Sequence, residues 1–169
     1  MLWSMAGPAE PVTLHAIRRL LLLLVAVVLL GTGADLVLLA HYEDGWQSLP
    51  LVVVAASVPA VAGAAIDGRA VAVRILQAAM LLLAVTGLVG LWLHHAGGRA
   101  FQLEMDPSIG GLPLWLKTLR AHSPPALAPA ALFHAALLGL LATYRHPALA
   151  VRTPLTHRHR HHPTQERNT

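Results

Sequence analysis

The chain has 169 residues, of which 56% are hydrophobic and only 12% are charged, about half the charged fraction of an ordinary globular domain. It contains no cysteine, which excludes disulfide bridges, thiolate metal sites and cysteine catalysis. The formal net charge is +4. The basic residues flank apolar segments instead of forming one stripe, so the pattern favours a membrane protein and argues against a nucleic-acid partner.

The first apolar segment, Leu20–Ala40, contains one ionisable residue, Asp35, and predicts a transmembrane helix over about residues 19–41. A helix of this length rises about 30 Å, the thickness of a bilayer's hydrocarbon core. Residues 1–16 form a polar N-terminal flank. Because Arg18 and Arg19 precede the leucines, a cleaved signal peptide is the alternative. Apolar sequence resumes directly after Asp35, and this favours an uncleaved helix.

A second membrane-spanning helix is predicted over about residues 49–66. Pro59 lies in its middle and should kink it, which membrane helices tolerate when neighbours satisfy the freed carbonyl. Ala56, Ala60 and Ala64 recur every four residues. Small residues at this spacing allow two helices to approach closely, so we expect this face to pack against a neighbour.

A third spanning helix is predicted over about residues 74–95. Gly87, Gly90 and His94 fall on one face of it, at positions i, i+3 and i+7. We therefore expect this face, His94 included, to turn toward other helices. His95 lies about 100° further round the helix and should reach water.

The longest connection is predicted between residues 96 and 125. Its first five residues, AGGRA, should be flexible, and Asp106 followed by Pro107 predicts a turn. Residues 112–122 then favour a short amphipathic helix that lies on the membrane surface. Its apolar positions are Leu112, Trp115, Leu116 and Leu119, and the opposite positions are Lys117, Thr118 and Arg120.

A fourth spanning helix is predicted over about residues 126–144 and carries His134 near its middle. The tail, residues 146–169, is basic and rich in histidine. Such a tract can bind metal ions, whereas arginines near a membrane surface attract anionic lipids. We favour lipid contact, or a solvated tail with no specific ligand, over metal binding.

The basic residues predict the orientation in the membrane. With four spans, both termini lie on one side, and loops rich in Lys and Arg stay in the cytoplasm. Nine of the 12 Lys and Arg residues would then be cytoplasmic: Arg18, Arg19, Arg69, Arg74, Arg145, Arg152, Arg158, Arg160 and Arg167. The other three are Arg99, Lys117 and Arg120. We predict cytoplasmic N- and C-termini in the plasma membrane of a bacterium, the inner membrane.

This topology gathers carboxylates and imidazoles at the outer end of the bundle. Together they are suitable ligands for Zn²⁺, Mn²⁺, Fe²⁺ or Cu²⁺. No dense ligand motif such as HExxH supports a metal site, so the alternative is that most of these residues are solvated loop residues. The candidate ligands are His41, Glu43, Asp44, His94, Glu104 and Asp106.

Asp35 and His134 form a second candidate site, because both fall inside apolar spans. An ionisable group within a membrane is costly and normally faces the bundle interior. The two could hydrogen-bond across the first and fourth helices. A structural polar pair and a proton- or cation-handling pair are both consistent with this placement.

Haem b is a third hypothesis, since bis-histidine ligation needs two imidazoles on facing helices at one depth. His41 and His94 could meet that condition, and His134 suits it less well. The sequence has no Walker loop, GxSxG or Gly-rich dinucleotide turn.

The sequence thus predicts an all-α integral membrane bundle of four transmembrane helices with a short interfacial amphipathic helix in the third connection. A non-enzymatic accessory or interaction subunit is the favoured function, with the lipid bilayer and another membrane subunit or a second copy as partners. The alternatives are a transition-metal or proton/cation handling protein with an outward-facing site, and a b-type haem redox protein.

Overall fold

The computed structural model describes residues 11–40, 45–120 and 127–150, and helices with short connections make up all of this part of the chain. The all-helical prediction is therefore confirmed for the described residues. The elements are α1 (Val12–Leu38), α2 (Ser48–Asp67), α3 (Ala70–Met105), α4 (Gly111–Arg120), α5 (Leu127–Thr143) and the short 3₁₀ helix η1 (Pro147–Leu149).

Three of the helices are long and apolar enough to cross a membrane, namely α1, α2 and α3. With 27, 20 and 36 residues, they rise about 40, 30 and 54 Å respectively. Helix α5 is equally apolar but shorter, with 17 residues and a rise of about 25 Å. A membrane location follows from the three long helices.

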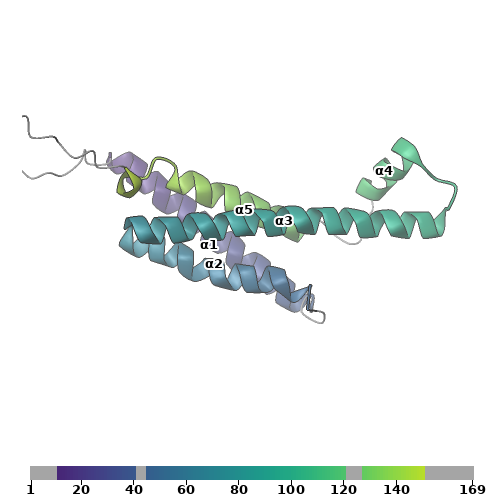
Figure 1. Ribbon diagram of the computed structural model, residues 1–169, viewed down its shortest axis with the longest axis horizontal. Helices are drawn as coiled ribbons and strands as arrows, with labels where there is room; N and C mark the ends of the chain where they lie inside the picture. The colour runs from purple at the N-terminus through teal and green to yellow at the C-terminus, as the bar shows by residue number, and fades with distance from the viewer. Residues whose placement is uncertain (1–10, 41–44, 121–126, 151–169) are drawn as a thin grey trace, which may run out of the picture.

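The four apolar helices form a ring in the order α1, α2, α3, α5. Helix α1 packs against α2 and α5, and α3 packs against the same two helices from the other side (Figure 1). Neighbours run antiparallel: Gln77 near the start of α3 donates to the Thr143 hydroxyl at the end of α5, at 3.2 Å. Both described chain ends therefore lie at one end of the bundle.

A tight turn joins α2 to α3 at that same end. Gly68 ends α2 with a φ of 59°, in the left-handed region that glycine adopts without a steric penalty. Arg69 is extended and immediately precedes α3. Because only two residues separate the helices, their antiparallel packing is set locally.

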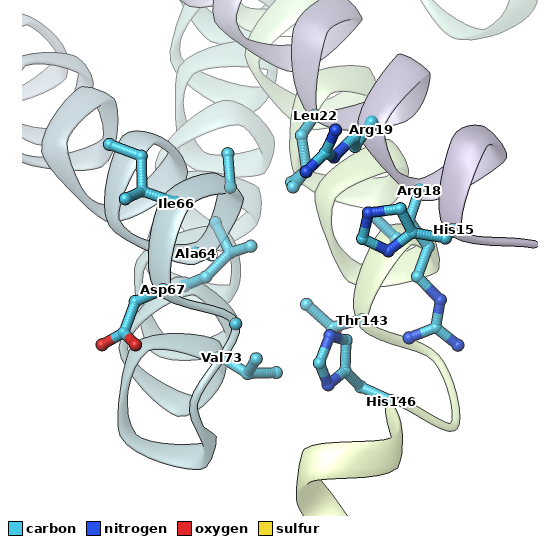
Figure 2. Close-up of a pocket in the computed structure, with 14 residues that line it drawn as sticks. His15, Arg18, Arg19, Leu22, Ala64, Ile66, Asp67, Val73, Thr143 and His146 are labelled. Carbon is cyan, nitrogen blue, oxygen red and sulfur yellow. The ribbon is translucent and has the colours of Figure 1, made fainter. Parts of the chain in front are cut away.

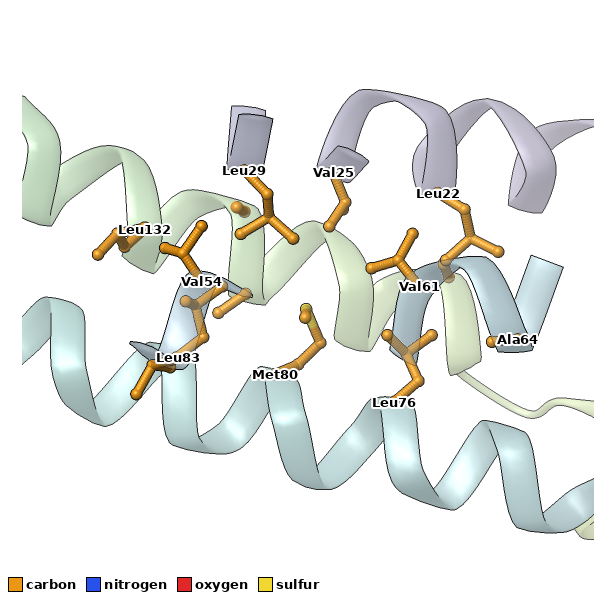
Figure 3. Packing of buried hydrophobic residues seen from close by; sticks show 14 of the residues in the cluster. Leu22, Val25, Leu29, Val54, Val61, Ala64, Leu76, Met80, Leu83 and Leu132 are labelled. Carbon is orange, nitrogen blue, oxygen red and sulfur yellow. The ribbon is translucent and has the colours of Figure 1, made fainter. Parts of the chain in front are cut away.

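The core is apolar and is built from residues that recur at helical spacing. Val25 and Leu29 of α1 and Leu76, Met80 and Leu83 of α3 are fully buried (Figure 3). The opposite faces of the helices carry large apolar side chains toward the outside, which is unusual for a water-soluble surface and suits contact with lipid. Examples on α1 are Leu20, Leu23, Leu24, Val27 and Leu30.

Glycines on α3 bring it close to α5, as their shared face predicts. A Cβ added at Gly87 would lie 2.8 Å from the Pro129 carbonyl oxygen, and one added at Gly90 would lie 3.0 Å from the Pro129 Cβ. Contacts below 3.0 Å force something to move. The close approach of these two helices therefore requires glycine at position 87.

The predicted alanine face of α2 is only partly buried. Ala60 and Ala64 are buried, but Ala56 is exposed, and Ser57 is buried in its place. The Ser57 hydroxyl donates to the Val53 carbonyl at 2.8 Å, which satisfies it within the helix. The buried face thus follows the 3.6-residue helical period instead of a strict repeat of four.

Helix α3 is longer than predicted. The sequence predicted that it ends near residue 95 and is followed by a flexible segment. It continues without a break to Met105 through Gly97 and Gly98. Gly98 is buried, and an added Cβ there would lie 3.2 Å from the Thr118 Cγ2 of α4. Packing by α4 therefore stabilises a glycine-containing stretch that local propensity alone disfavours.

A side-chain turn ends α3. The backbone amide and the hydroxyl of Ser108 both donate to the Asp106 Oδ1, at 3.1 and 2.6 Å. These two hydrogen bonds lower the pKa of Asp106 below its ordinary value of 3.8, because they favour the charged carboxylate. The predicted turn at this position is confirmed.

Helix α4 is present but is oriented differently from the predicted amphipathic helix. Leu114 and Thr118 are buried, and Thr118, predicted on the polar side, donates its hydroxyl to the Leu114 carbonyl at 2.9 Å. Leu112, Trp115 and Leu119 are exposed. Their apolar side therefore faces away from α3.

Candidate functional site

A cavity of about 150 Å³ lies at the end of the bundle where α1 begins and α5 ends. The beginning of α1, the last turn of α2, the start of α3 and the end of α5 surround it (Figure 2). Its polar lining residues are His15, Arg18, Arg19, Asp67, Thr143 and His146.

Arg18 holds α1 against the end of α5 at this cavity. Its side chain is only 7% exposed. The guanidinium Nη2 donates to the carbonyl oxygens of Tyr144 and Arg145, at 3.0 and 3.3 Å. Carbonyls at a helix C-terminus lack partners within the helix and carry partial negative charge. A buried guanidinium is therefore well placed to satisfy them.

The acidic residue of the cavity is engaged elsewhere. Asp67 forms an ion pair with the guanidinium of Arg69, two residues along the chain, at 2.5 Å. This contact raises the pKa of Arg69, mainly through the hydrogen bond. Figure 2 shows the Asp67 carboxylate pointing away from His15 and His146. The basic residues among the described lining residues are His15, Arg18, Arg19 and His146.

The structure places Asp35 and His134 apart from this cavity and does not join them. Both side chains are exposed on the outer surface of the single bundle, instead of facing its interior. The His134 Nδ1 lies 2.7 Å from the Ala130 carbonyl oxygen of its own helix and donates to it in the corresponding tautomer. The described chain contains no hydrogen bond between the predicted pair.

The candidate metal ligands divide between described and undescribed parts of the chain. His41, Glu43 and Asp44 lie outside the described residues. His94 is half-buried on α3, and Glu104 is exposed further along the same helix. Within residues 11–40, 45–120 and 127–150, no three His, Cys, Asp or Glu side chains are grouped so that they could hold a metal ion.

The haem hypothesis named three histidines, and one of them, His41, lies outside the described residues. Of its two other candidates, His94 is half-buried and His134 is exposed.

Sequence reasoning missed the basic cavity although it used Arg18 and Arg19 to predict orientation. His15 precedes the apolar segment and His146 follows the last one, so neither attracts notice in a search for polar residues within spans. The chain topology could have predicted that these residues lie close together. An even number of antiparallel helices brings the start of the first and the end of the last to one end of a bundle.

Comparison of the chain with protein families, curated proteins and solved structures finds no match. The fold nevertheless defines a class: three helices long and apolar enough to cross a bilayer indicate a small helical membrane protein.

Proposed function

We propose that this chain is a non-enzymatic, multi-pass membrane protein of four spans that acts as an accessory or interaction subunit of a membrane assembly. Helices α1, α2, α3 and α5 form the membrane-embedded part. The last turns of α3 together with α4, residues 94–120, form a projecting hairpin that we call the arm. The observation that carries the proposal is the set of exposed apolar side chains on this arm.

The arm extends well beyond the bundle (Figure 1). Near its beginning α5 contacts α3 at Gly87 and Gly90, so the last 12 residues of α3, 94–105, continue past this contact. They add about 18 Å of helix. A helix of 36 residues is far longer than the roughly 20 residues needed to span a bilayer, which supports a role for the excess outside it.

The two helices of the arm pack against each other, and the arm also has exposed apolar side chains. Gly98 of α3 faces Thr118 of α4, and Leu114 of α4 is buried. The side chains that remain outside include aromatic residues and a methionine, types enriched at protein interfaces. The exposed apolar residues of the arm are Phe101, Met105, Leu112, Trp115 and Leu119. A small, internally packed element with such a surface is suited to dock a partner.

Site-specific photocrosslinking in native membranes tests the proposal. A photoreactive amino acid at Trp115, on the apolar side of α4, should give a discrete protein adduct. The same group at Lys117, exposed on another side of α4, should give much less of it. The double variant Trp115→Ser, Leu119→Ser should lose co-purification of that protein.

Lipid adducts at position 115 with no protein adduct would contradict the accessory role. They would assign α4 to the bilayer surface as an interfacial amphipathic helix.

A further inference from the structure

We propose that the basic cavity between the beginning of α1 and the end of α5 is a binding site for a phosphate group. The phosphate belongs either to a phospholipid headgroup or to a soluble phosphate, since both present the same oxygens. This proposal is independent of the role of the arm, which lies at the other end of α3.

Side-chain charge favours an anion in the cavity. His15 and Arg19 reach it from α1, and His146 reaches it from the segment that follows α5. Asp67, the acid among the described lining residues, is paired with Arg69. The guanidinium of Arg19 at the low-dielectric wall of the cavity creates a positive potential that attracts anions.

Helix dipoles do not oppose this conclusion. Helices α1 and α3 begin at this end of the bundle, while α2 and α5 end here, so the partial charges of their termini largely cancel. The C-terminal carbonyls of Tyr144 and Arg145 are moreover satisfied by Arg18. The side chains therefore decide the sign of the local potential.

Within the cavity, Arg18 and Arg19 have different tasks. Arg18 is buried and its Nη2 is committed to backbone carbonyls, which makes it a positioning residue. Arg19 is exposed on the adjacent position and lines the same cavity. A guanidinium matches the geometry of phosphate oxygens and can contact two of them at once. We assign direct phosphate contact to Arg19.

The size of the cavity restricts the ligand. Its volume is about 150 Å³. Pockets for drug-sized ligands are about 300–1,000 Å³. A tetrahedral oxyanion is therefore a better fit than a nucleotide or a large metabolite.

The cavity lies beside the apolar surface of α1. Arg18 and Arg19 are followed on α1 by Leu20, Leu23 and Leu24, whose side chains are exposed. Figure 2 shows Leu22 at the cavity beside Arg19. A headgroup phosphate in the cavity could thus leave its acyl chains along this apolar surface. Basic residues near a membrane surface attract anionic lipids.

Two measurements on the purified full chain test the proposal. Native mass spectrometry measures retention of dioleoyl phosphatidylglycerol against dioleoylglycerol, which has the same chains without phosphate. Thermal unfolding measures stabilisation by inorganic phosphate against chloride at equal ionic strength. We expect Arg19→Gln to weaken binding by about tenfold, the effect of losing one charged hydrogen bond.

Arg74→Gln is the matched control. Arg74 is exposed near the start of α3 and does not line the cavity. Its loss removes the same charge, and we expect a change below about twofold. The unfolding temperatures of both variants without ligand verify that each one folds.

Retention of the phospholipid without a response to inorganic phosphate supports the site and assigns it to a headgroup. A response to inorganic phosphate without retention of the phospholipid supports the site and assigns it to soluble phosphate. Absence of phosphate-dependent binding in both measurements overturns the proposal. Equal weakening by Arg19→Gln and Arg74→Gln also overturns it, because it would indicate diffuse surface attraction.

Discussion

At the scale of single residues, Gly87 has the clearest structural requirement. An added Cβ would lie 2.8 Å from the Pro129 carbonyl and 2.9 Å from the Phe133 amide nitrogen of α5. Both atoms belong to a helical backbone and cannot rotate away. The sequence indicated this face through the spacing of Gly87, Gly90 and His94, although it did not identify α5 as the neighbour.

We expect Gly87→Ala to destabilise the bundle by about 1–3 kcal/mol, the usual cost of overpacking. Unfolding of the detergent-solubilised protein by a denaturing detergent, followed by circular dichroism, measures this. Gly31→Ala is the matched control, because an added Cβ at Gly31 meets nothing within 4 Å. It should be neutral or stabilising by up to about 1 kcal/mol. Equal losses in the two variants would contradict close packing between α3 and α5.

A second prediction at this scale concerns the acid that ends α3. The pKa of Asp106 is lowered by the Ser108 hydroxyl and then by the Ser108 amide. A lowered pKa in the folded state means that the charged carboxylate stabilises the turn above the unfolded-state pKa. That contribution is lost as pH falls through the lower, folded-state pKa.

We expect Ser108→Ala to move the pKa of Asp106 upward, toward its ordinary value of 3.8. Carbon-detected NMR titration of the Asp106 carboxyl group measures the shift. Ser48→Ala is the control, because the Ser48 hydroxyl donates to the Gly45 carbonyl. An unchanged Asp106 titration in Ser108→Ala would refute the assigned cause.

At the scale of elements, the arm depends on contact between α3 and α4. Gly98 faces α4, and its neighbour Gly97 faces open space, with nothing within 4 Å of an added Cβ. Valine at either position brings the same gain in side-chain volume and the same helix propensity. Only at position 98 would that volume meet the Thr118 side chain.

We expect Gly98→Val to displace α4 and Gly97→Val to leave it in place. Because the chain has no cysteine, spin labels at Glu104→Cys and Lys117→Cys report one distance without background. The distance distribution should broaden or lengthen in Gly98→Val alone. Similar distributions in both valine variants would mean that α4 does not pack on this face of α3.

At the scale of the whole molecule, the exposed apolar surface of the bundle predicts firm insertion in a bilayer. The protein should remain in the membrane fraction after alkaline carbonate extraction, since removal would expose this surface to water. Reporter tags on the N- and C-termini should both respond from the cytoplasm, in line with the distribution of Lys and Arg. Release by carbonate, or tags in opposite compartments, would contradict the four-span topology.

The sequence by itself determined that the chain is helical and membrane-seeking. Long apolar segments such as residues 19–41 indicate this locally, because their length and hydropathy do not depend on contacts with other parts of the chain. Two other local patterns, Asp106 followed by Pro107 and the spacing of Gly87 and Gly90, located the turn after α3 and its glycine face.

Only the tertiary structure decided which polar residues meet and how far α3 extends. The basic cavity joins Arg18 to the carbonyls of Tyr144 and Arg145, more than 120 positions away in the chain, and no local pattern encodes such a pairing. The outward positions of Asp35 and His134 likewise depend on how each helix rotates to bury its best-packing face. The arm forms because α4 folds back onto Gly98, a contact that outweighs the low helix propensity of glycine.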